Sequence, residues 1–272
     1  MALPVQCHAL QNQGRHSGTI ARSLGPRRQA PNEPGITGGV ARVSPPVSET
    51  IKVDIWSDVQ CPWCYIGKRK FEAGVAAFGA DVDVEYHSFE LAPDTPVDFA
   101  GSPVDYLSER KGIPVPQVLE MLERVTGIAE SVGLHYDYDA VHQTNTVKAH
   151  ELLHYAKAHG QQLEMKESLL KAYFVDGGHV GRIDDLADLA AGIGLDRADV
   201  VRSLTENEYL AAVKADVAQA NEYGIQGVPF FVIDGKYGIS GAQDPDIFAQ
   251  ALRQVQSEKT GTTPTVVEET SA

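Results

Sequence analysis

The sequence predicts an α/β protein in which an all-helical block interrupts a small sheet-containing unit. Alternating apolar residues indicate strands towards both ends of the chain, at 51–55 and 82–86 and again within 227–240. Between them, from 93 to about 204, apolar residues recur every three or four positions, which is the spacing of helices. The elements therefore follow the order βαβ, helical block, αββα.

The first α/β segment carries the motif Cys61-Pro62-Trp63-Cys64 where a strand leads into a helix. Pro62 suits the first helical position, because its missing N–H needs no partner there. We expect the helix to run from Trp63 to Phe78 and to end at Gly79. A second strand follows and fades near Leu91.

Six segments of the middle block have helical periodicity: 103–111, 116–132, 146–159, 163–175, 184–192 and 197–204. A further helix has Leu210 and Val213 on one face and stops at Gly224. The last segment contains a buried strand at 227–233, a tight Asp234-Gly235 turn, a strand at 237–240 and a helix. We expect that helix to open with Asp244 as its cap and Pro245 as its first residue, and to end near Val255.

Composition narrows the class of protein. The net charge of −14 over 272 residues disfavours nucleic acid or an anionic membrane as a partner. No apolar run approaches the ~18 residues of a membrane span. Residues 1–50 are rich in Gly, Pro, Ser, Gln and Arg without apolar periodicity, and 257–272 are rich in Thr and Glu, so we expect both to be disordered. The N-terminal stretch lacks the apolar core of a secretory signal, which predicts a cytoplasmic protein.

Cys61 and Cys64 are two of only three cysteines, too few for a structural disulfide framework. Their spacing lets the thiols close a small disulfide ring. At a helix start the first sulfur faces backbone N–H groups and the positive end of the helix dipole, which favours thiolate. A thiolate beside a resolving thiol is the equipment for thiol–disulfide exchange.

A second feature lies far along the chain, where Val228-Pro229 precedes the buried strand. Proline donates no ladder hydrogen bond and is confined to strand starts and edges. With a cis bond here, the backbone of Val228 would face outward and could pair with an extended peptide. A strand–CxxC–helix unit combined with a late Val-Pro hairpin is the arrangement of thioredoxin folds.

The chain resembles the DsbA family of thioredoxin-fold oxidoreductases, in its FrnE-like branch, which is related to 2-hydroxychromene-2-carboxylate isomerases and kappa-class glutathione transferases. The resemblance covers about 51 to 256. The residues that carry it are Asp54-Ile55-Trp56-Ser57-Asp58, Cys61 to Lys68, Phe89-Glu90-Leu91, Asn145-Thr146 with Ala149-His150, Ala172-Tyr173-Phe174, Gly227 to Val232, and Ser240-Gly241-Ala242.

The resemblance implies a thioredoxin-like fold interrupted by an all-helical insertion domain. The implied boundaries are a thioredoxin-like domain at 51–92 and 206–256, with the helical insertion at 93–205. Cys61 would attack the substrate, Cys64 would resolve the mixed disulfide, and Pro229 would be a cis-proline that faces both sulfurs.

Asp58, Asn145 and Thr146 each have more than one interpretation. Asp58 is a candidate proton relay to Cys64, although an acid that caps the turn is an equal interpretation. Asn145 and Thr146 fit a helix cap better than a site, while the resemblance places them near the redox centre. With Pro62, Trp63 and Val228 they complete the expected substrate contacts.

One motif points elsewhere. His150-Glu151-Leu152-Leu153-His154 matches the H-E-x-x-H pattern of zinc proteases. Lys157 stands where the extended motif needs glycine, and no partner motif supplies a third ligand. We therefore interpret the segment as ordinary helix and predict no metal site.

The leading functional hypothesis is a thiol–disulfide oxidoreductase, with isomerase activity left open, which acts on protein or small-molecule thiols. It needs no cofactor beyond the redox-active cysteines. Glutathione is a candidate co-substrate, and glutathione or a thioredoxin system is the expected redox partner. The alternatives are a glutathione-dependent isomerase or transferase of the kappa or 2-hydroxychromene-2-carboxylate type, which the intact cysteine pair disfavours, and a non-catalytic peptide-binding or chaperone module.

Overall fold

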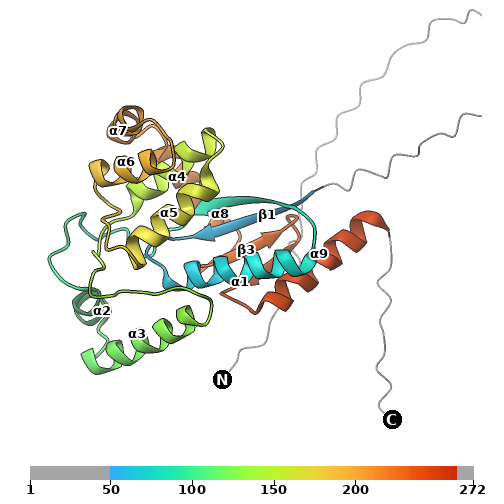
Figure 1. The fold of residues 1–272 in the computed structure, drawn as a ribbon, viewed down its shortest axis with the longest axis horizontal. Coiled ribbons are helices and arrows are strands. Elements are labelled where there is room, and N and C mark those ends of the chain that lie inside the picture. The colour runs from blue at the N-terminus through green and yellow to red at the C-terminus, as the bar shows by residue number, and fades with distance from the viewer. Residues whose placement is uncertain (1–49, 262–272) are drawn as a thin grey trace, which may run out of the picture.

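The computed structural model describes residues 50–261, and its centre is a four-stranded mixed sheet (Figure 1). The strands are β1 (Ile51–Ser57), β2 (Val82–Ser88), β3 (Phe230–Ile233) and β4 (Tyr237–Ser240). They lie in the order β2-β1-β3-β4. β1 runs parallel to β2 and antiparallel to β3, and β4 is antiparallel to β3. This topology confirms the predicted thioredoxin-like fold.

Helices surround the sheet and fill the block between β2 and β3 (Figure 1). In chain order they are α1 (Pro62–Phe78), α2 (Pro103–Lys111), α3 (Val115–Glu130), α4 (Val147–Ala158), α5 (Gln162–Phe174), α6 (Ile183–Gly192), α7 (Arg197–Thr205), α8 (Leu210–Glu222) and α9 (Pro245–Thr260). Each predicted helix is present within about two residues at its start. The all-helical insertion is therefore confirmed as an architecture.

The two faces of the sheet have separate cores because successive strand residues point to opposite sides. Val53 and Ile55 of β1 belong to the core beneath α1 and α9, together with Phe71 and Phe248. Trp56 belongs to the core on the opposite face. There α8 covers the sheet through Ala220, and the Trp56 indole donates to the Asp216 carbonyl over 3.1 Å.

The insertion does not have a core of its own. The largest hydrophobic cluster joins the insertion helices to the start of α1. It includes Val59, Tyr65 and Ile66 beside the cysteine motif, and Leu152, Leu169 and Leu186 from the insertion. Apolar side chains from both parts are thus removed from water together, which ties the cysteine turn to the insertion.

Three predicted boundaries are corrected. β3 starts at Phe230 rather than Gly227, because Pro229 cannot donate to the ladder. The last helix continues past Val255 to Thr260 and ends at Gly261, whose φ of 66° suits a left-handed cap, so the tail does not begin at 257. Asp244 caps by position only, since its side chain forms no cap hydrogen bond and instead pairs with Lys70 at 3.1 Å.

The predictions of disorder for 1–49 and 262–272 lie outside the described residues. Within residues 50–261, no helix combines the length and apolar character required to cross a bilayer.

Candidate active site

The cysteine motif forms the turn between β1 and α1. Cys61 occupies the N-cap position with extended backbone, and Pro62 begins the helix as predicted. The turn is closed by Cys61 N–H to the Asp58 carbonyl (3.3 Å) and by Cys64 N–H to the Cys61 carbonyl (3.0 Å). Both cysteines are free thiols in this structure. The strand therefore delivers two thiols to one helical turn.

The Val228–Pro229 bond is cis, and it lies against the cysteine turn. The Cys61 thiol donates to the Val228 carbonyl, with 3.4 Å between sulfur and oxygen. On the next turn of α1, a Cβ on Gly67 would come within 2.8 Å of Pro229 Cγ, so only glycine allows this approach. The two features that the sequence separates by 167 residues are in contact.

Both cysteines of the motif are buried. Cys61 is 3% exposed and Cys64 is 2% exposed. Trp63 between them is 37% exposed, and Val228 is half-buried. Little of the Cys61 side chain is therefore accessible to a substrate in this structure.

The pKa values of the two thiols shift in opposite directions. The pKa of Cys61 is raised well above its ordinary value, mainly by the neighbouring Cys64 sulfur and by burial. Burial acts against ionisation of Cys64 as well, yet its pKa is lowered by the Cys61 sulfur and by the charge of Lys166. Burial and the second sulfur thus oppose the effect of the helix start on Cys61.

Asp58 is fully buried beside the turn. Its carboxylate accepts from the Leu91 N–H (2.8 Å) and from the Gln60 side-chain amide (3.1 Å), and it lies 3.4 Å from Nε2 of His150. Burial opposes ionisation, but His150 and these donors lower the pKa of Asp58. These contacts support the interpretation that Asp58 braces the turn as a carboxylate; the proton relay to Cys64 stays a prediction.

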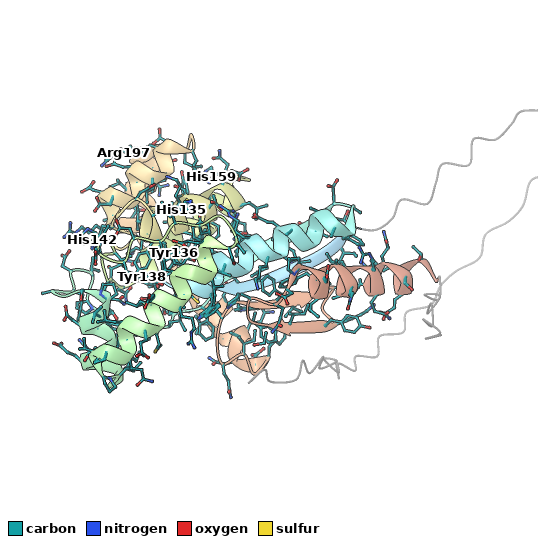
Figure 2. The ribbon with its side chains drawn as sticks, turned by 60° about the horizontal axis from the view of Figure 1, so that its bottom comes forward. His135, Tyr136, Tyr138, His142, His159 and Arg197 are labelled. Atoms are coloured by element: carbon teal, nitrogen blue, oxygen red, sulfur yellow. The ribbon has the colours of Figure 1, made fainter. Side chains whose placement is uncertain are left out.

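The insertion forms the wall beside the motif. The loop between α3 and α4 brings Tyr136 to the start of α1, where its hydroxyl donates to the Pro62 carbonyl at 2.7 Å (Figure 2). Gln143 from the same loop donates to the Gln60 side chain (2.9 Å) and accepts from the Tyr173 hydroxyl (3.2 Å). The insertion thus fixes the position of the cysteine turn.

A pocket of about 290 Å³ opens beside the motif, between α1 and the insertion. Pro62 and Trp63 line it on the motif side. The insertion side is mostly apolar and aromatic, with Tyr106, Leu122, Tyr138 and Phe174, and Lys111 stands among the lining residues. Two of the five residues predicted to contact the substrate, Pro62 and Trp63, therefore line this pocket.

Asn145 and Thr146 lie at the start of α4, as predicted. The Asn145 side chain accepts from the Val147 N–H (2.9 Å) and donates to the Pro93 carbonyl (2.8 Å). Thr146 is buried and its side chain forms no cap hydrogen bond. The cap is therefore made by Asn145, and a substrate role for either residue stays a prediction.

The two histidines of the H-E-x-x-H segment on α4 contact different carboxylates. His150 Nε2 faces Asp58, whereas His154 Nε2 lies 3.0 Å from Asp216 on the other side. Glu151 is fully buried and pairs with Lys148 at 2.8 Å. The interpretation as ordinary helix was too simple, because both imidazoles contact buried carboxylates.

Lys166 on α5 is a neighbour of the cysteines that sequence reasoning missed. It is fully buried and its charge lowers the pKa of Cys64. The signal was available, since Lys166 lies at helical spacing between Gln162 and Leu169, on the buried face of α5. A lysine at a core position of a helix is unusual unless it is paired.

Comparison with known proteins agrees with this geometry. A model of the DSBA-like thioredoxin domain matches residues 52–253. The uncharacterized protein YwbO of Bacillus subtilis (strain 168) is 31% identical over 212 residues, which is 77% of this chain and 100% of that protein.

Solved structures give the same assignment. A probable DsbA oxidoreductase of Streptomyces coelicolor is 35% identical with a TM-score of 0.71, over 82% of this chain and 95% of the other. A 2-hydroxychromene-2-carboxylate isomerase is 16% identical with a TM-score of 0.60, over 78% of this chain and 100% of the other, and shares the fold. The family model covers most of the chain, and the chain belongs to the DsbA-like thioredoxin-domain family, to which thiol–disulfide oxidoreductases belong.

Proposed function

We propose that the protein is a dithiol–disulfide oxidoreductase that exchanges the Cys61–Cys64 disulfide with thiols of a protein or small molecule. The observation that carries the proposal is the contact between the Cys61 thiol and the carbonyl of Val228, next to cis-Pro229. The contact supports a substrate site at this point, because an extended substrate next to Cys61 would lie beside the Val228 backbone and could pair with it.

The reaction follows from the order of the two sulfurs. A substrate thiolate attacks Cys61, the S–S bond breaks, and its electron pair goes to Cys64. A second substrate thiolate then attacks the mixed disulfide, and Cys61 leaves. The substrate loses two electrons and becomes a disulfide, while the enzyme gains them as a dithiol. The opposite flux and isomerisation use the same steps.

The pocket beside Trp63 indicates which kind of substrate group would fit next to the cysteines. Its walls are largely apolar, with Leu122, Tyr138 and Phe174 among them. Such a cavity favours an apolar or aromatic group next to the reacting sulfur, because burial of apolar surface is favourable. In the direction written, oxidised glutathione would accept the two electrons and restore the disulfide. In the opposite direction, reduced glutathione or a thioredoxin system would restore the dithiol. We place the reaction in the cytoplasm.

A redox titration tests the proposal directly. The purified protein is equilibrated in glutathione buffers of graded ratio, its thiols are alkylated, and the mass shift is measured. We expect a reversible two-electron transition. C61S should abolish oxidation of a two-cysteine peptide. C64S should trap a mixed disulfide with the oxidised form of that peptide, because Cys61 attacks the peptide disulfide and no second enzyme thiol displaces it.

Two outcomes would contradict the proposal. If the wild-type cysteines never cycle under these conditions, the domain is a binding module rather than an oxidoreductase. If C64S retains a glutathione-dependent turnover, the glutathione-dependent isomerase or transferase becomes the better assignment, because that chemistry does not need a second cysteine.

A further inference from the structure

Lys166 is a buried cation without a fixed partner. Its side chain is among the largest that are fully buried. Among residues 50–261, its Nζ has no hydrogen-bond acceptor. The ring of Tyr86 lies nearby, with 5.3 Å between Nζ and the ring centroid. An ammonium group in such a site is costly unless a nearby anion compensates it.

The groups that face Lys166 come from β2, from α1 and from the turn before α1. They are Tyr86, Lys68, Asp58, Cys61 and Cys64. Asp58 already has compensation from His150, Leu91 and Gln60. Lys68 adds repulsion, and it is itself paired with Glu72 and Glu167 at 2.5 Å and 2.6 Å.

The cysteine pair therefore supplies the anion that Lys166 lacks. The pair is an anion only after the disulfide has opened. A Cys61–Cys64 disulfide carries no charge, whereas attack on Cys61 opens it and places the released electron pair, and with it a negative charge, on Cys64. In agreement, burial lowers the pKa of Lys166, while the sulfurs act to raise it, Cys64 most strongly. The balance of charge around Lys166 changes each time the disulfide opens.

We propose that Lys166 is a positioning residue that stabilises the Cys64 thiolate when the disulfide opens, so that the helical insertion, through α5, sets the redox equilibrium of the cysteine pair. This inference rests on the proposed function. It also gives the insertion a chemical role besides that of a wall.

The step is balanced with the groups present. The substrate attacks Cys61 as a thiolate, its proton having gone to solvent. A substrate–Cys61 S–S bond forms, and the Cys61–Cys64 bond breaks with its electron pair on Cys64. The Lys166 ammonium then faces the Cys64 thiolate that has just formed. The second substrate thiol then attacks, and its proton goes to Cys61 as that sulfur leaves.

The experiment compares K166M with K171M. Methionine keeps the unbranched shape of lysine at the core position and removes the charge. Lys171 lies on the same helix but is exposed and paired with Asp176, so K171M makes the same chemical change away from the cysteines. K166Q, with a neutral polar side chain, serves as a second variant should K166M fail to fold.

Two quantities are measured: the equilibrium constant with glutathione, and the free energy of unfolding of the oxidised and the reduced protein. An opposite charge beside a thiol shifts its pKa by about 1–3 units. K166M should therefore shift the equilibrium towards the disulfide about tenfold or more, which is about 30 mV or more for two electrons. Its stability should rise more in the oxidised than in the reduced form. K171M should change neither.

Each result bears on the inference. A tenfold shift in K166M or K166Q with none in K171M supports it. Equal stability changes in both redox forms with an unchanged glutathione equilibrium would overturn it, because Lys166 would then be only part of the packing. A wild-type protein that forms no reversible disulfide would instead remove the proposed function, so the two failures are distinguishable.

Discussion

Two groups of ionisable side chains, buried or half-buried, flank helix α4, and they differ in how many of their polar atoms have partners. The sheet cluster consists of Asp54, His87, His154 and Asp216. The cysteine cluster consists of Asp58, His150 and Lys166. α4 supplies one histidine to each, four residues apart.

The sheet cluster is fully connected. His87 lies 3.0 Å from Asp216 and 2.8 Å from Asp54, and its ring stacks on Trp56 with centroids 4.5 Å apart. Asp216 also accepts from the Ser88 N–H at 2.7 Å and contacts His154 at 3.0 Å. Such a network holds one arrangement of α8 against β2.

The cysteine cluster contains polar atoms without hydrogen-bond partners. Among residues 50–261, three nitrogen atoms of this cluster have no hydrogen-bond partner: both ring nitrogens of His150 and the Nζ of Lys166. The contrast suggests a rule for this fold: the satisfied cluster maintains structure, and the unsatisfied one leaves room for a charge that appears during the reaction. The following predictions test that contrast, beginning with the largest expected effect.

Asp216→Asn should have the largest effect on stability. It removes the charge opposite two histidines, and breaking a buried ion pair costs about 3–5 kcal/mol. Urea unfolding of the oxidised protein measures this. The control is D188N, because Asp188 pairs with Arg197 on the exposed surface of α6 and α7 (Figure 2), where such pairs contribute less than about 1 kcal/mol. Equal losses in the two variants would contradict the importance of the sheet cluster.

Stability should also fall at alkaline pH. Although burial opposes protonation, Asp216 and Asp54 raise the pKa of His87 to about 9. Because this folded pKa lies above the unfolded value, the stabilisation is fully present below about pH 6.5 and is lost as the pH rises through about 9. The loss should be roughly 3 kcal/mol, measured on the oxidised form so that neither Cys61 nor Cys64 titrates. In H87Q the alkaline loss should shrink; an unchanged profile would exclude His87 as its source.

The two histidines of α4 offer a matched pair. H154Q should lower the free energy of unfolding by about 1–3 kcal/mol in both redox forms, because Asp216 loses a buried partner. H150Q should instead alter the gap between the redox forms. With the Asp58 carboxylate less compensated, the nearby thiolate is disfavoured, and the glutathione equilibrium should shift a few-fold towards the disulfide. If H154Q moved that equilibrium as far as H150Q, the two clusters would not be separate.

Chelation should have the smallest effect. Within the part of the chain that the structure describes, three metal-ligating atoms come together only at Asp54, Glu85 and His87. Lys52 already occupies these acids, at 2.9 Å from Asp54 and 3.1 Å from Glu85. EDTA treatment should therefore leave the melting temperature and thiol exchange unchanged. Equimolar zinc in untreated protein, with activity lost on chelation, would contradict this.

Much of the fold was predictable because local rules decide it. Apolar periodicity located the helices of the insertion, and Pro62 and Gly79 marked the two ends of α1. Errors arose where a backbone detail outweighs the pattern. The apolar run at 227–233 predicts a strand from Gly227, but Pro229 delays pairing until Phe230.

The site was only partly predictable. Cys61, Cys64 and Pro229 follow from motif spacing and order, and the structure brings them together. The role of Lys166 could not be predicted, because its helical position indicates a buried face without naming what lies opposite. The helix-dipole argument for a Cys61 thiolate leaves out the second sulfur and burial, both of which raise the pKa of Cys61.

The sequence by itself determined the order of strands and helices, the cysteine pair at a helix start, and the proline that limits the third strand. These depend on residues close together in the chain. Tertiary structure alone decided how the pKa values of the two thiols diverge, how deeply the pair lies, and which cation faces it. Those properties depend on distance and burial between β1, α1, α4 and α5, and no local pattern in the chain encodes the electric field at their meeting point.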